Sequence, residues 1–160
     1  MATTATPMGA EPTDTLSASG SFTGKVRHIK IASAYGTAIF YGDFVKLVAA
    51  GTVEKAAVTT AVAAGTVGIF VGCTYTDPNS SQMTFNQQWP ASTTASDAYA
   101  YVVDDPKLLF RMQGDEAIAQ TGLGNNVSAV STAGSTSIGR SKNALDGGSI
   151  ATTNSLPLRI

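Results

Sequence analysis

Few residues in this 160-residue chain have the types and spacing that catalysis requires. The single histidine, His28, stands between Arg27 and Ile29, whereas Ser-His-Asp and Cys-His enzymes place an imidazole beside a nucleophile. Its position in a short alternating run favours a structural or surface histidine over a general base. No segment combines a nucleophile, a base and an orienting group, so we predict that the chain is not an enzyme and has no catalytic residue.

Two adjacent carboxylates, Asp104 and Asp105, lie between apolar runs in the segment VVDDPKLLF. Paired carboxylates can bind a metal ion or hydrolyse a glycosidic bond. Neighbouring residues of a strand point to opposite faces, however, and so rarely converge on one ligand. Pro106 presets φ for a turn, and the aspartate before it can accept hydrogen bonds from nearby backbone donors. The pattern favours a turn over a cation site, and we expect no metal ligand here.

The chain has one cysteine, Cys73, which excludes an internal disulfide and a multi-cysteine metal site. In the run GIFVGCTY, strand alternation places Cys73 on one face with Ile69, Val71 and Tyr75. This favours a buried structural cysteine over a reactive thiol. The segment TGLGNN has a Gly-x-Gly but lacks the third glycine of a dinucleotide site, so we expect no cofactor.

The sole tryptophan, Trp89, lies in the polar segment NQQWPAS. From an exposed loop it could stack on a sugar ring, as in a carbohydrate-binding β-sandwich. A sugar site usually has several aromatic platforms, so the sequence favours an anchor in the core or in a subunit interface.

Charged residues form only 13% of the chain, about half the usual share of roughly 25%, and the net charge is −1. This composition argues against a dedicated nucleic-acid binder. Because few charged groups would lose water, the free-energy cost of covering this surface with a protein partner is low. The one basic cluster, GKVRHIK, is either an ordinary strand with a polar outer face or a contact strip for an acidic protein surface. The interface candidates are Phe22, Lys25, Arg27, Lys30 and Trp89.

Residues 1–20 are small and polar, and alone they cannot bury enough apolar area to offset their ordering entropy. We predict a flexible N-terminal arm that is ordered only by a neighbouring subunit, followed by a single β domain at 21–160. The arm has no basic region followed by an apolar one, so we expect no signal peptide and synthesis in the cytoplasm. Polar residues interrupt the apolar tract 45–73, which argues against a membrane span.

From Phe22 onward, short β-rich runs alternate with turn residues. These runs predict an all-β fold, either a small barrel or tulip-like domain or a sandwich, with long C-terminal loops and at most one or two short helices. The expected strands are KVRHIKIA, TAIFY, DFVKLVA, TVGIFVGCTYT, AYAYVVD and KLLFRMQ.

Four further local features are expected. The hexamer VAAGTV occurs at 48–53 and 62–67, which indicates the same turn at two hairpin ends. The acidic start of the segment at 115–122 and its closing Gly122 make it the best helix candidate. We also expect one helical turn closed by Gly147, and the beginning of a strand at 156–160.

The order of these segments resembles that of small structural proteins of tailed bacteriophages. A polar arm is followed by a basic strand, by YGDFVKL with a Gly-Thr turn, by VGIFVGCTYTD, by a Trp-Pro pair in a polar loop, and by AYAYVVDDPKLLF. The chain looks most like their capsid decoration, or cement, proteins. The match covers roughly residues 22–112, with a looser similarity at 125–146.

This resemblance implies a compact β domain, commonly a homotrimer, that clamps across major capsid protein subunits on the outer surface of the virion. The N-terminal arm would pair with capsid protein or with a neighbouring subunit. No membrane and no direct nucleic-acid contact are expected. Members of the group run on into a closing strand, so we expect either a strand from a partner subunit to close this domain or its tail to differ. Another virion component of the neck, tail or fibre, and a carbohydrate-binding sandwich, stay open as alternatives.

Overall fold

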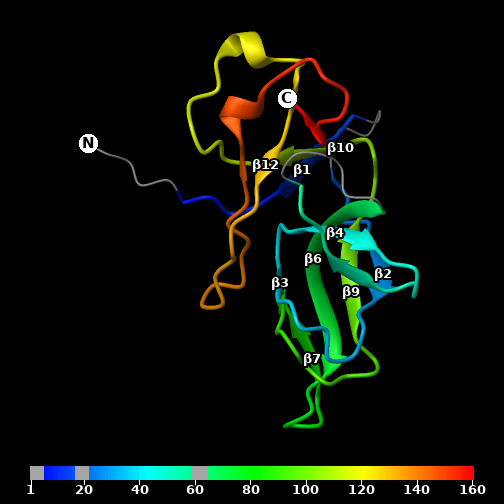
Figure 1. The fold of residues 1–160 in the computed structure, drawn as a ribbon. Coiled ribbons are helices and arrows are strands. Elements are labelled where there is room, and N and C mark those ends of the chain that lie inside the picture. Colours follow the sequence, from blue (N-terminus) through cyan, green and yellow to red (C-terminus); the bar gives the residue numbers. More distant parts are fainter. Residues whose placement is uncertain (1–5, 17–21, 59–64) are drawn as a thin grey trace.

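The computed structural model describes residues 6–16, 22–58 and 65–160, and in these residues the fold is almost entirely β (Figure 1). The prediction of an all-β domain is confirmed, and the two short helices are 3-10 turns, η1 (Gln120–Gly122) and η2 (Gly147–Ser149). The strands are β1 (Glu11–Thr15), β2 (Arg27–Lys30), β3 (Ile39–Phe40), β4 (Phe44–Leu47), β5 (Val53–Lys55), β6 (Thr66–Thr76), β7 (Met83–Asn86), β8 (Gln88–Trp89), β9 (Tyr99–Val103), β10 (Leu108–Arg111), β11 (Asn126–Val127), β12 (Ala129–Val130), β13 (Ala144–Leu145) and β14 (Leu158–Arg159).

One antiparallel sheet of six strands forms the main body. Its order is β2-β9-β6-β4-β5, and β7 pairs with the far part of β6. The β6–β7 hairpin projects at one end of the molecule (Figure 1). The two edges of the sheet meet at a single bridge between Ile31 and Val53, so the sheet curls without closing into a barrel.

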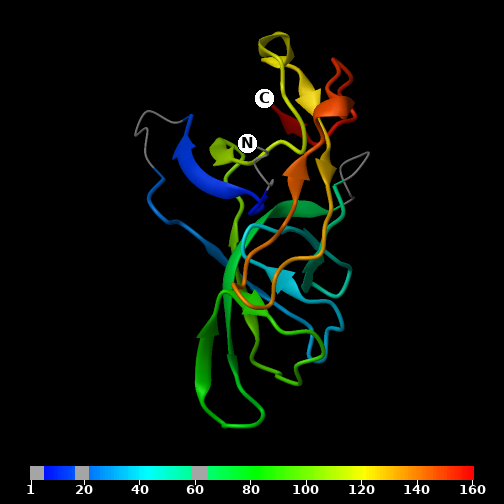
Figure 2. The ribbon, with the colours of Figure 1, turned by 90° about the vertical axis from the view of Figure 1, so that its left-hand side faces the viewer.

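Small two-stranded sheets surround this body. β1 pairs with β10 and β3 with β8, while β11 pairs with β14 and β12 with β13. Most of the C-terminal third gathers at the end of the molecule opposite the β6–β7 hairpin, with β1 and β10 beside it (Figure 2). Segments far apart in the sequence therefore share one end of the fold.

The core consists of two clusters on opposite faces of the central strands. Phe70 and Val45 belong to the larger cluster, whereas their chain neighbours Ile69 and Phe44 belong to the smaller one. This division follows from strand geometry, because successive side chains point to opposite faces. β4 and β6 thus hold both clusters together.

The N-terminal arm differs from expectation over residues 11–15. These residues form β1, which pairs with β10 of the same chain, from Glu11 opposite Arg111 to Thr15 opposite Leu108. Ala10 is also fully buried in the smaller cluster. The order thus comes from the chain's own β10, and a neighbouring subunit is not needed for this segment. The flexible character predicted for residues 1–5 and 17–20 concerns segments outside the described residues.

The helix predicted at 115–122 is wrong except for its last turn, η1. The backbone N–H of Asp115 donates to the carbonyl oxygen of Leu145, and Gly114 forms a β-bridge with the same residue. The start of this segment therefore pairs with β13 and does not form a helix. The expected helical turn closed by Gly147 is also wrong, because Ala144–Leu145 form β13 and the 3-10 turn η2 begins at Gly147 instead of ending there. The last expected strand is present as β14, which pairs with β11 of the same chain.

The first VAAGTV hexamer makes the predicted hairpin turn between β4 and β5. Gly51 has a φ of 74°, a backbone conformation that side chains disfavour. Residues 62–64 of the second copy lie outside the described residues, and its remaining residues lead into β6.

Candidate functional site

The outer face of the six-stranded sheet is covered along only part of its length. Around Phe44 and Ile69 the smaller core cluster covers it. Beyond a β-bulge between Phe70 and Gly72 the same face carries aromatic and apolar side chains that no other element covers in the described residues. We call this part the aromatic face. It comprises the exposed Met83, Phe85 and Tyr99 and, beside them, the half-buried Val26, Val71 and Tyr101.

Strand register brings these side chains together. Thr74 of β6 lies opposite both Phe85 of β7 and Tyr99 of β9, so the three residues share one face. The rings of Phe85 and Tyr101 have centroids 5.5 Å apart, and His28 packs edge-on against Tyr101 at 4.4 Å. The Tyr101 hydroxyl also donates to Thr74 Oγ1 at 3.3 Å.

Gly72 makes room for this arrangement at the bulge. Its φ is 144°, which favours glycine, and a β-carbon there would lie 3.3 Å from the ring of Phe85. A residue with a side chain at this position would push that ring away from the sheet.

Exposure makes the aromatic face unusual for a small protein. Met83 is 80% exposed and Phe85 is 65% exposed. Beside them a shallow hollow of about 280 Å³ is lined by Val26, Val71, Phe85 and Tyr101. Contiguous exposed apolar surface of this kind marks a site of interaction with another molecule.

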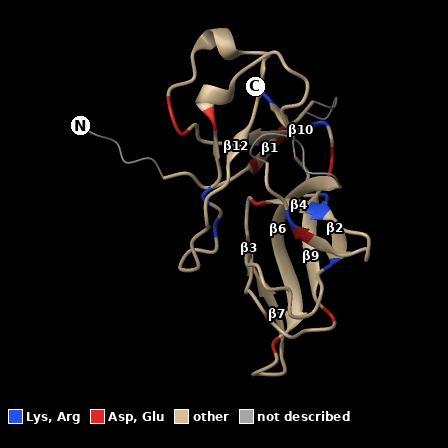
Figure 3. Cartoon of the chain, viewed as in Figure 1, with Lys and Arg blue, Asp and Glu red and all other residues tan. Residues whose placement is uncertain are grey.

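The predicted basic residues lie along one edge of this face. Among the described strands β2 has one partner, β9, so its other edge is available for contact. Arg27 is paired with Asp104 at 2.6 Å, whereas Lys25 and Lys30 are exposed and form no ion pair within the described residues. Figure 3 shows how sparse charge is over the rest of the chain. Phe22, the remaining candidate near β2, is half-buried.

Trp89 is not an interface residue, which corrects that part of the sequence prediction. Its side chain is fully buried in the larger core cluster, with Tyr75 packed edge-on at 5.4 Å. The indole Nε1 donates to the carbonyl oxygen of Tyr35 at 3.3 Å. Its polar flanks suggested a surface position, but pairing of β8 with β3 turns the ring inward. The core alternative is therefore the correct one.

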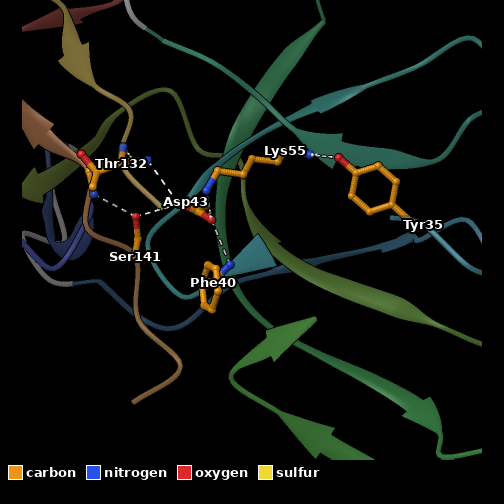
Figure 4. A network of polar contacts seen from close by, with 7 residues as sticks. Tyr35, Phe40, Asp43, Lys55, Thr132 and Ser141 are labelled. Carbon is orange, nitrogen blue, oxygen red and sulfur yellow. Dashed lines mark hydrogen bonds and ion pairs between the residues drawn. The ribbon is translucent and has the colours of Figure 1, made fainter. Parts of the chain in front are cut away.

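A second feature, which the sequence did not reveal, is a buried polar network around Asp43 (Figure 4). Lys55 Nζ lies 2.9 Å from Asp43 Oδ2, and the backbone N–H of Phe40 donates to the same oxygen at 2.9 Å. Ser141 Oγ and Asn143 Nδ2 donate to Asp43 Oδ1 at 2.6 Å and 3.2 Å. Asp43 and Asn143 have no exposed surface.

One feature of the sequence points to this network: the carboxylate of Asp43 lies inside the apolar run AIFYGDFVKLV. A buried charge needs a partner and hydrogen bonds, because an unpaired one costs several kcal/mol. Its partners Ser141 and Asn143, however, stand about a hundred residues later, where no local pattern connects them to Asp43.

The burial of Cys73 and the turn at Asp105 agree with the structure, but the predicted common face of Cys73 with Ile69 and Val71 is wrong. The bulge between Phe70 and Gly72 shifts the alternation, so Cys73 lies in the larger core cluster and Ile69 and Val71 lie at the smaller one. Cys73 is fully buried, and its thiol lies 3.3 Å from the carbonyl oxygen of Gln88. Burial raises the pKa of this thiol to about 12, which leaves it protonated and unreactive at neutral pH. Asp105 begins the predicted turn, and its carboxylate accepts from the backbone of Lys107 at 2.9 Å. His28 is an exposed strand residue.

Two other clusters of side chains lie outside the aromatic face and the Asp43 network. Asp115, Glu116 and Asp146 bring carboxylate oxygens within 4.8 Å of one another. Two of these side chains already accept hydrogen bonds, Asp115 from Gly147 and Asp146 from Ser128, and so they act as links between loops. An apolar hollow of about 240 Å³ lies where β4, β6 and β9 meet Leu108, Phe110 and Leu158. Asp104, one of the two aspartates that line this hollow, is already paired with Arg27.

Comparison with protein-family models, with curated proteins and with solved structures found no match to the chain. In the part of the chain that the structure describes, no helix is both long and apolar enough to cross a membrane.

Proposed function

We propose that this protein decorates and stabilises a bacteriophage capsid by clamping across major capsid protein subunits on the outer surface of the virion. In this role it acts as a homotrimer, and no cofactor takes part. The aromatic face is the surface that meets the capsid protein. The assignment to a phage is based on the sequence, because the order of this chain's segments resembles that of capsid decoration proteins.

The observation that carries the proposal is the exposed aromatic face on a rigid sheet. Met83, Phe85 and Tyr99 are presented by strands that are fixed by their own ladders, so binding would not require them to be ordered first. Aromatic residues and methionine are the side chains enriched in the core of protein interfaces.

The positive charges beside the aromatic face indicate which kind of partner surface would fit it. Lys25 and Lys30 border the aromatic face without an ion pair in the described chain, so a complementary surface is apolar at its centre and acidic at its rim. The free edge of β2 adds backbone groups that a capsid strand can pair with. Each contact is modest, but many copies on one shell add their contributions.

Of the alternatives, the carbohydrate-binding sandwich loses its main support, because Trp89 is fully buried and cannot stack on a sugar. A neck, tail or fibre component differs from a shell clamp chiefly in copy number. Quantitative peptide mass spectrometry of purified virions should find this chain at a copy number comparable with that of the major capsid protein. A copy number of only a few per particle would assign the chain to the neck, tail or fibre instead.

A substitution on the aromatic face tests the binding surface directly. Phe85→Ser should weaken cosedimentation with expanded capsid shells about tenfold or more, because an exposed aromatic anchor is removed from the contact. Leu123→Ser is the matched control, since Leu123 is 73% exposed but lies at η1, away from this face. Equal binding by the two variants would exclude the aromatic face as the docking surface.

A further inference from the structure

Three reactive side chain types converge at the buried network described above. The carboxylate of Asp43 contacts an amine, Lys55 Nζ at 2.9 Å, through one oxygen and a carboxamide, Asn143 Nδ2 at 3.2 Å, through the other (Figure 4). Asp43 and Asn143 are fully buried, and the side chain of Lys55 is 15% exposed. A nucleophile, a proton carrier and an acyl group thus meet in one place that excludes most water.

The carboxamide of Asn143 is held at both ends. Its oxygen Oδ1 accepts a hydrogen bond from the backbone N–H of Thr132 at 3.1 Å, and its nitrogen donates to Asp43. A fixed backbone donor on the carbonyl oxygen stabilises the negative charge that develops there when a nucleophile attacks the carbon. The carboxyl at the nitrogen is placed to protonate that nitrogen as it leaves.

Lys55 supplies the nucleophile. Transfer of one proton across the contact with Asp43 converts the ammonium and carboxylate into a neutral amine and a carboxylic acid.

We propose that Lys55 and Asn143 form an intramolecular amide cross-link in the folded protein. The amine attacks Cγ of Asn143, the new Nζ–Cγ bond forms, and the Cγ–Nδ2 bond breaks. Asp43 passes two protons in turn from Lys55 Nζ to the departing nitrogen, which is released as ammonium, and ends as the carboxylate it was at the start. The step needs no oxidant and no cofactor, and it requires the amine to shift from Asp43 toward the carboxamide bound to the same carboxylate.

A link between Lys55 and Asp43 itself, with loss of water, is the competing product. In that reaction Asp43 would be the acyl group, and the contacts of Lys55 in the described chain include no second carboxyl to carry protons. The arrangement therefore favours Asn143. The cross-link would join β5 to the segment before β13, and it does not depend on the proposed capsid role.

The test is the intact mass of the purified full-length protein after incubation at neutral pH. The wild-type mass should be lower than the sequence mass by one ammonia. Trypsin should no longer cleave after Lys55, and tandem mass spectrometry should find peptide 47–107 joined to peptide 143–159. The full sequence mass in a protein shown to be folded by circular dichroism would overturn the proposal.

Lys55→Arg is the control, because it keeps the positive charge beside Asp43 but has no attacking amine. This variant should keep its full mass. Loss of ammonia that persists in Lys55→Arg would show cyclisation of the asparagine alone and would overturn the cross-link. Loss of water, with a peptide joined at Asp43, would overturn the assignment to Asn143.

Discussion

At the scale of single residues, Asp97 shows how a strand neighbour sets the charge of a surface carboxyl. The hydroxyl of Thr76 donates to Asp97 Oδ2 at 2.6 Å and the backbone N–H of Thr76 to Oδ1 at 3.2 Å. The side-chain hydrogen bond first, and then the backbone one, lower the pKa of Asp97 from its ordinary value of 3.8. This contact therefore contributes stability above pH 3.8, which is lost as the pH falls through the folded-state pKa.

Replacement of that hydroxyl gives a direct prediction. Thr76→Val should raise the pKa of Asp97 toward 3.8, because the hydrogen bond that lowers this pKa most is gone. A carboxyl-carbon NMR titration measures the change. Thr74→Val, which loses only the hydrogen bond from Tyr101, is the control and should leave the Asp97 titration in place.

Cys73 predicts the behaviour of the protein in alkali. Its pKa is raised by burial from 9.0 to about 12, so the unfolded chain loses this proton first as the pH rises. Stability from the buried thiol is complete below pH 9 and is lost as the pH rises toward 12. Denaturant titrations should show the free energy of unfolding falling by about 1.4 kcal/mol per pH unit through this group.

The variant Cys73→Ala separates that contribution from every other effect of alkali on the protein. Its free energy of unfolding should fall less steeply above pH 9 than that of the wild type. Parallel slopes in the two proteins would contradict the prediction.

Residue properties set by near neighbours could be predicted from the sequence, and those set by distant partners could not. The apolar run GIFVGCTY indicated that Cys73 is buried, although not on which face, and Asp105-Pro106 indicated a turn. The role of Asp43 depends on Ser141 and Asn143, and the burial of Trp89 depends on β3. Such information lies in the pairing of strands, which local sequence does not contain.

At the scale of elements, the close approach of β6 and β9 depends on Gly68. A β-carbon at this position would overlap the carbonyl oxygen of Val103. Gly68→Ala should therefore separate the two strands and cost about 3 kcal/mol in the free energy of unfolding, measured by chemical denaturation.

Gly36→Ala provides a control of the same chemistry. No atom lies within 4 Å of the β-carbon it would add, and its backbone needs no positive φ. The expected change is within about 0.5 kcal/mol. Equal effects of the two substitutions would show that contact at Gly68 does not limit strand pairing.

The strands that could be predicted are those with strong apolar alternation, and β6 begins and ends where the run TVGIFVGCTYT does. β1 was missed because EPTDT has low strand propensity and is ordered only by its ladder with β10. The segment at 115–122 was given a helix because its first turn is acidic, yet its backbone bonds to Leu145. In both cases tertiary pairing outweighed local preference.

At the scale of the whole molecule, the network around Asp43 ties the C-terminal segment to the central sheet. Ser141 donates to Asp43 at 2.6 Å and accepts from the backbone N–H of Asn143 at 3.1 Å. Ser141→Ala should lower the free energy of unfolding by about 1–3 kcal/mol, because the carboxylate of Asp43 loses one of its donors and the backbone N–H of Asn143 loses its acceptor on Ser141. Hydrogen exchange should also rise in residues 141–145, since their attachment to the sheet is weakened.

Lys142→Ala is the neighbouring control. Lys142 is exposed, so its truncation should change the free energy of unfolding by no more than about 0.5 kcal/mol. If Ser141→Ala were equally mild, the network would not be the attachment of the C-terminal segment.

The aromatic face also determines how the protein responds to its surroundings. Dissolved salt screens interactions between exposed charges, with a Debye length of about 8 Å at physiological ionic strength, but it does not weaken apolar contact. Within the described residues, Lys25 and Lys30 are the unpaired cations that would contribute screened attraction at this face. In the proposed role, a contact built this way would keep nearly the same strength in fresh water, in a cell and in brine.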